Sequence, residues 1–163
     1  MHETINRLRN KKGDEGFTLI ELLVVVVIIG VLVAIAVPVY LNYRKGAADK
    51  SAQSDVRGAV SAVEQFYTDN GNAYPLTVSG ANDGTATGKI KLDLVATAGA
   101  TATQFITLSD KTQLGFNPSA TVTGTYTICG NNTGGSGKWY VYNSANGGSV
   151  KASTVASPSL TAC

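Results

Sequence analysis

Residues 16–43, GFTLIELLVVVVIIGVLVAIAVPVYLNY, decide the architecture of this chain. The 27 residues after Gly16 contain one acidic side chain, Glu21, and no basic one. Eighteen of them are Phe, Leu, Ile or Val. Each such residue favours insertion by roughly 0.3 to 0.6 kcal/mol at the centre of a membrane helix. The segment is therefore expected to enter a membrane. Glu21 opposes that insertion, so its place near the start of the run requires a functional reason.

The junction Gly16-Phe17-Thr18-Leu19-Ile20-Glu21 resembles the class III signal of type IV prepilins and type II secretion pseudopilins. In that family a membrane peptidase cuts after the glycine, and the new amino-terminal residue is N-methylated. The resemblance implies cleavage between Gly16 and Phe17 and N-methylation of Phe17. It also implies an assembly role for Glu21 and a helix-loosening role for Gly30 and Pro38. We expect Glu21 to pair with the amino-terminal nitrogen of Phe17 on a neighbouring subunit, because filament packing would bury both charges among aliphatic side chains. Neutralisation of its own helix end by Glu21 is the alternative.

The helical pattern continues beyond the apolar run. Apolar residues recur every three or four positions from Ala48 to Phe66, with polar residues on the opposite face. A helix over residues 17–67 would be about 75 Å long, whereas the hydrocarbon core is about 30 Å thick. We therefore expect a transmembrane or filament-core part over 17–43 and an amphipathic continuation over 44–70. Gly71, followed by Pro75, is expected to end the helix.

Residues 71–163 are expected to form a loop and a C-terminal sheet. The segment 76–104 is read as a loop with one short strand at 90–94. Strands are predicted at 105–108, 121–129 and 138–143, with a fourth candidate at 149–152 after a Gly-Gly turn. The predicted fold is α+β, with the long N-terminal helix packed on three or four antiparallel strands. This is also the pilin fold that the resemblance implies.

Residues 1–16 are interpreted as a cleaved leader. Their four basic residues keep this end in the cytoplasm under the positive-inside rule. A Sec signal peptide cut after Ala36 is the alternative. Glu21 inside the apolar run, the length of that run and the helical pattern beyond Ala36 argue against it.

Composition and side-chain inventory argue against an enzyme. The net charge is +2 for the whole chain, which favours neither nucleic acid nor an acidic surface as a partner. The single histidine, His2, lies in the leader, and no paired carboxylates, phosphate loop or activated cysteine are visible. Asp69 stands among amides, too few carboxylates for calcium. No cofactor, metal or catalytic residue is predicted.

Three features of the exported region have competing interpretations. Cys129 and Cys163 would lie beyond the membrane, where thiols oxidise, so we predict a disulfide rather than two free buried thiols. The Asn131-Asn132-Thr133 sequon is explained better as a turn than as a glycosylation site. The aromatic segment Trp139-Tyr140-Val141-Tyr142 could bind carbohydrate or single-stranded nucleic acid, but packing on the helix is favoured.

The resemblance implies a structural subunit of a type IV pilus, inserted in the cytoplasmic membrane and then polymerised into an extracellular filament. Its implied partners are further copies of itself, a prepilin peptidase and methyltransferase, the inner-membrane assembly platform with its ATPase, and the lipid bilayer before assembly. A pseudopilin of a secretion or DNA-uptake system is one alternative, and a non-polymerising membrane-anchored binding module is another. Adhesion, motility and any surface or DNA ligand are not specified by the sequence.

Overall fold

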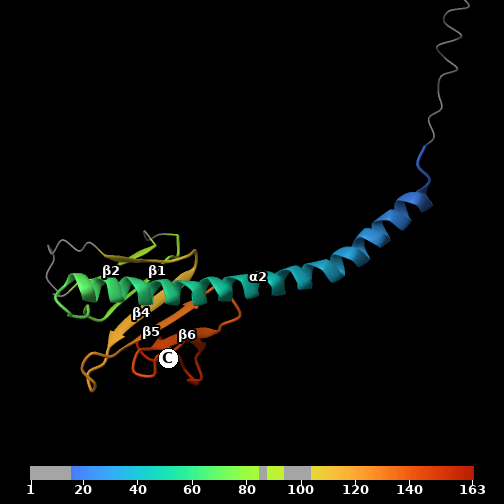
Figure 1. Cartoon of the computed structure of the whole chain (residues 1–163). Coiled ribbons are helices and arrows are strands. Elements are labelled where there is room, and N and C mark those ends of the chain that lie inside the picture. The colour runs from blue at the N-terminus through green and yellow to red at the C-terminus, as the bar shows by residue number, and fades with distance from the viewer. Residues whose placement is uncertain (1–15, 85–87, 94–103) are drawn as a thin grey trace, which may run out of the picture. The chain divides into compact units, whose positions relative to one another are not determined.

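A computed structural model describes residues 16–84, 88–93 and 104–163. The leader prediction for residues 1–15 lies outside this range. The chain divides into two compact units, one ending at Tyr40 and the other beginning at Leu41. The elements are α2 (Leu19–Asp69), β1 (Val78–Ala81), β2 (Lys89–Lys91), β3 (Phe105–Thr107), β4 (Thr112–Pro118), β5 (Tyr126–Asn132), β6 (Trp139–Asn143) and β7 (Lys151–Ala152). Figure 1 labels all of them except β3 and β7.

Helix α2 has the predicted extent. It begins at Leu19 and ends at Asp69. Gly71 follows with φ 67° and Asn72 with φ 64°, both in the left-handed region. The amide of Asn72 donates to the carbonyl of Tyr67 at 3.0 Å, which satisfies one of the last carbonyls of the helix. The predicted glycine cap is therefore confirmed.

The main sheet has five strands in the order β1-β4-β5-β6-β7, and all of its pairings are antiparallel. Strands β2 and β3 form a separate antiparallel pair. The second half of α2 lies across one face of the main sheet (Figure 1). The predicted class, a long helix packed on an antiparallel sheet, is confirmed.

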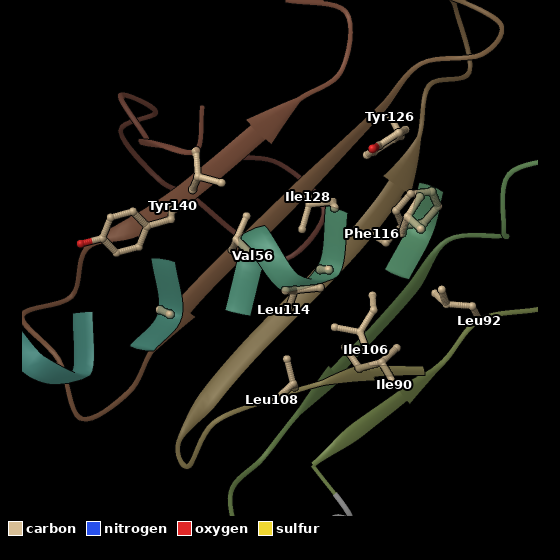
Figure 2. Packing of buried hydrophobic residues seen from close by; sticks show 14 of the residues in the cluster. Val56, Ile90, Leu92, Ile106, Leu108, Leu114, Phe116, Tyr126, Ile128 and Tyr140 are labelled. Atoms are coloured by element: carbon tan, nitrogen blue, oxygen red, sulfur yellow. The ribbon is translucent and has the colours of Figure 1, made fainter. Parts of the chain in front are cut away.

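The core lies between the second half of α2 and the two sheets. Five helix residues at alternating spacings of four and three are buried: Ala52, Val56, Ala59, Val63 and Phe66. Facing them in Figure 2 are alternate residues of β4, β5 and β6, together with the paired strands β2 and β3: Leu114, Phe116, Tyr126, Ile128, Tyr140, Ile90 and Ile106. Tyr140 is 7% exposed and Tyr142 packs against the same cluster, so the packing interpretation of the aromatic strand is confirmed.

The strands predicted at 90–94, 105–108, 138–143 and 149–152 are confirmed as β2, β3, β6 and β7, but the predicted number of strands was wrong. The main sheet has five strands rather than three or four. The sequence pattern reveals neither β1 nor β4, and the strand expected at 121–129 is β5, which begins only at Tyr126. Strand β4, TQLGFNP, contains Gly, Asn and Pro, which are depleted in strands. Its conformation is fixed by pairing with neighbours on both sides, which local propensity does not report.

The turn expected at Asn131-Asn132-Thr133 was also wrong. Asn131 and Asn132 end strand β5 and are both buried. The side-chain amide of Asn132 donates to the carbonyl of Asp110 at 2.8 Å and to the Thr112 hydroxyl at 3.1 Å. Asn131, the sequon asparagine, is only 8% exposed. Its burial argues against glycosylation of the folded domain.

A disulfide fastens the C-terminal segment to the sheet. Cys129 of β5 is bonded to Cys163, as predicted. The same segment crosses β4 where the side chain of Asn117 donates to the carbonyl of Leu160 at 2.8 Å. A Cβ atom at Gly115 would collide with that Leu160 carbonyl, so only glycine allows this close approach.

Candidate assembly site on the N-terminal helix

The amino-terminal end of α2 is built around Thr18 and Glu21. Thr18 immediately precedes the helix, and Glu21 lies three residues further on. One Glu21 carboxylate oxygen accepts from the Thr18 amide at 2.8 Å and from the Thr18 hydroxyl at 2.7 Å. The Glu21 amide in turn donates to the Thr18 hydroxyl oxygen at 3.3 Å. This reciprocal arrangement is a capping box, which satisfies amides that have no partner within the helix.

The capping box gives Glu21 a role within its own chain. Sequence reasoning considered neutralisation of the helix end by Glu21 but missed Thr18 as its partner. The Thr-x-x-Glu spacing before an apolar run was the available signal. Phe17 lies just before the helix and is 85% exposed. The structure therefore leaves the predicted pairing of Glu21 with a neighbouring Phe17 as a prediction.

The apolar surface that follows is uncovered. Every residue from Phe17 to Tyr43 is exposed in the single chain. By length and composition, α2 is apolar enough to cross a membrane. Helix α2 is continuous through Gly30 and Pro38, and a Cβ atom at Gly30 would meet open space. The expected loosening at these two residues stays a prediction.

Two carboxylates on the second half of α2 hold loops of the domain in the same way. Asp49, only 4% exposed, accepts from the Ser136 amide at 2.9 Å and from the Ser136 hydroxyl at 2.5 Å. Asp55 accepts from the Ser109 amide at 2.8 Å and from the Ser109 hydroxyl at 2.9 Å. Each carboxylate thus binds both donors of one serine. Sequence reasoning assigned Asp49 to the polar face, did not single out Asp55, and missed both contacts.

Two further acids of α2 contact the far end of the domain. Glu64 accepts from the Tyr126 hydroxyl at 2.5 Å, and Asp69 accepts from the side-chain amide of Gln104 at 2.9 Å. Tyr126 also lies within an aromatic cluster, with its ring 5.0 Å from Tyr74 and 5.8 Å from Tyr142. Burial, followed by the hydrogen bond to Glu64, raises the pKa of Tyr126 well above its usual value.

Alkaline pH should therefore destabilise the domain. Burial also raises the pKa of Tyr74 and of Tyr140, the latter with a further contribution from the charge of Asp49. The unfolded chain then loses these protons first, so the free energy of unfolding is unaffected below about pH 10 and falls above it. Each such tyrosine steepens the fall by about 1.4 kcal/mol per pH unit.

Tyr126→Phe should flatten this fall, as measured by near-ultraviolet circular dichroism of the detergent-solubilised chain during alkaline titration. Tyr43→Phe is the matched control, because Tyr43 is 77% exposed. Equal alkaline transitions in the two variants would contradict the assignment to Tyr126.

Comparison with known proteins identifies the N-terminal region. Residues 11–37 match the family model described as the prokaryotic N-terminal methylation motif. The chain is 37% identical over 70 residues to type II secretion system core protein G of Aeromonas hydrophila, covering 43% of this chain and 48% of that protein. It is 43% identical over 61 residues to fimbrial protein EcpC of Eikenella corrodens, covering 37% and 40%. It is 42% identical over 58 residues to the type IV major pilin protein PilE1 of Neisseria gonorrhoeae, covering 36% and 35%.

These matches span less than half the length of the relatives. The motif, the apolar helix and the antiparallel sheet define a class of proteins with a class III signal and a pilin-like α+β fold. Over its N-terminal region the chain is homologous to type IV pilins and to a type II secretion pseudopilin.

Proposed function

We propose that this protein is a structural subunit of a type IV pilus that polymerises through its N-terminal helix. The observation that carries the proposal is the capped apolar helix end, in which every residue from Phe17 to Tyr43 is exposed around one carboxylate, Glu21. Such a surface requires either lipid or copies of itself to cover it. In a filament, a bundle of these helices would cover the apolar surface.

The proposed organisation follows from the same helix. Residues 1–16 form the cleaved leader, 17–43 the transmembrane or filament-core helix, 44–70 its amphipathic continuation, and 71–163 the globular region. The subunit is inserted in the cytoplasmic membrane, processed by a prepilin peptidase and methyltransferase, and drawn into an extracellular filament by an assembly platform and its ATPase. The methylation motif at residues 11–37 supports the processing step.

A pseudopilin of a type II secretion system is the second candidate. The match to core protein G of Aeromonas hydrophila extends over 70 residues, against 58 for the gonococcal pilin. The two functions differ in whether this chain forms long filaments outside the cell. Electron microscopy of sheared surface material, with mass spectrometry of its main band, should show long filaments composed of this chain. Their absence, together with loss of secretion in a deletion strain, would favour the pseudopilin.

Cleavage is expected between Gly16 and Phe17, because the junction matches the methylation motif. Amino-terminal sequencing of the extracted mature chain should begin at Phe17, and its mass should include one methyl group. A Gly16→Leu precursor should stay uncut. A mature chain that begins at Val37 would instead indicate Sec processing and contradict the proposal.

A further inference from the structure

A cavity of about 400 Å³ opens in the second unit where the apolar run ends. Its wall on α2 includes Leu41, Arg44 and Lys45. Its opposite wall comes from the loop before β4, with Asp110 and Lys111, and from the end of β5. Three cationic side chains therefore line this cavity with one carboxylate, an excess of two positive charges.

The loop wall of the cavity is fixed by hydrogen bonds. The backbone amide of Lys111 donates to Asn82 at 2.6 Å, and the Lys111 carbonyl accepts from the Thr133 amide at 2.9 Å. The side-chain amide of Asn132 holds the carbonyl of Asp110 at 2.8 Å. Lys111 is thereby kept at φ 59°, a left-handed conformation that lysine rarely adopts. The backbone of Lys111 is thus fixed in the cavity wall.

The lysines of the cavity are available to an external anion. Among the residues that the structure describes, neither Lys45 nor Lys111 forms an ion pair. Both lysine side chains belong to exposed residues. An anion that reached the cavity would therefore meet ammonium groups without displacing an existing carboxylate.

The height of the cavity relative to a bilayer follows from helix geometry. The 27 residues from Phe17 to Tyr43 rise about 40 Å, which is the thickness of a bilayer with its headgroups. Arg44 and Lys45 come directly after this segment. In a membrane-inserted subunit these two side chains therefore lie at the level of the outer headgroups, where long basic side chains extend toward phosphate.

We propose that this cavity binds the phosphate of an anionic phospholipid headgroup, such as phosphatidylglycerol, while the subunit is stored in the membrane. The Arg44 guanidinium can donate two hydrogen bonds to phosphate, and Lys45 and Lys111 supply point charges from opposite walls. The proposal rests on the membrane-inserted stage of the proposed function and not on polymerisation. Lipid would hold the domain at the bilayer surface and would be released when the subunit leaves the membrane.

Native mass spectrometry of the mature chain in detergent micelles tests this binding. The chain is titrated with short-chain phosphatidylglycerol or phosphatidylcholine, and retained lipids are counted. We expect preferential retention of phosphatidylglycerol. Each lysine near an anionic surface contributes about fivefold to affinity, so Lys45→Gln/Lys111→Gln should lower it about 25-fold. The matched control, Lys89→Gln/Lys151→Gln, removes the same charge from exposed positions outside the cavity and should change retention little.

Two results would overturn the proposal. Equal losses in the two double variants would show a general charge effect rather than a site. Displacement of phosphatidylglycerol by inorganic phosphate at equal concentration would show that the lipid adds no affinity beyond its phosphate, and would assign the cavity to a free anion. Because the measurement needs no filament, it remains informative if the subunit fails to polymerise. Conversely, normal filaments from a chain that retains no phosphatidylglycerol would overturn the lipid site and leave the proposed function standing.

Discussion

A Glu21→Gln subunit, expressed without wild type, is expected to be inserted and cleaved normally but to yield at least about tenfold less filament. A tenfold change corresponds to ~1.4 kcal/mol, and the free energy lost when one partner of a buried charge pair is removed typically exceeds this value. Glutamine can replace glutamate in a capping box, so the cap with Thr18 is retained while the charge is removed. Filament packing would then bury the α-ammonium of Phe17 among aliphatic side chains with no carboxylate from a neighbour.

The yield is measured by quantifying the subunit in sheared surface material, with the cleaved membrane pool as reference. Thr18→Val provides the matched variant, because it removes the hydroxyl partner of Glu21 but leaves the carboxylate charge. We expect Thr18→Val to retain filaments. The opposite pattern, with normal filaments from Glu21→Gln and few from Thr18→Val, would assign Glu21 to the helix cap and refute the pairing between subunits.

The second large effect is expected from Cys163→Ser. The bond joins residues separated by 34 positions. Closing a loop of that size lowers the conformational entropy of the unfolded chain and stabilises the folded domain by at most about 4 kcal/mol. This is a large part of the roughly 5 to 15 kcal/mol that stabilises a typical domain. Cys129 is fully buried and can remain as a small apolar side chain. Denaturant unfolding of the solubilised chain should shift accordingly, and an unchanged midpoint would contradict a stabilising role.

Gly115→Ala tests the same C-terminal segment without touching sulfur. Its new methyl group would collide with the Leu160 carbonyl, so the segment must move off β4 and lose the hydrogen bond from Asn117. Gly58→Ala is the control, because open space surrounds Gly58 on the exposed side of α2. Hydrogen exchange of residues 159–163 should accelerate in Gly115→Ala only. Equal protection in both variants would mean that the segment does not depend on this contact.

Helix α2 could be predicted from the sequence because its signals are local. An unbroken apolar run, a recurring stripe from Ala52 to Phe66 and the glycine cap at Gly71 all act within a few residues. The Cys129–Cys163 bond could also be predicted, since the chain has only these two cysteines. Strand β4 could not be predicted, because its Gly115 is required by a carbonyl 45 positions further along the chain, at Leu160.

The candidate site was only partly predictable for a related reason. The junction at Gly16 and Phe17 and the carboxylate of Glu21 are visible in the sequence, and the Thr18 cap was visible but missed. The contact of Asp49 with Ser136 joins residues 87 positions apart, and that of Asp55 with Ser109 joins residues 54 apart. No periodicity links such pairs, so an acid that holds a loop looks like an acid that faces solvent.

Neutral donors contact all four acids through which α2 holds the globular region: two serines, one tyrosine and one glutamine. None of these contacts is an ion pair, so ionic strength should change their strength little beyond ordinary screening of the carboxylates. Helix α2 should therefore stay packed on the globular region at low and at high salt concentration. In the proposed extracellular filament, where ionic strength is not regulated, a change in salt concentration would therefore not detach the globular region from α2.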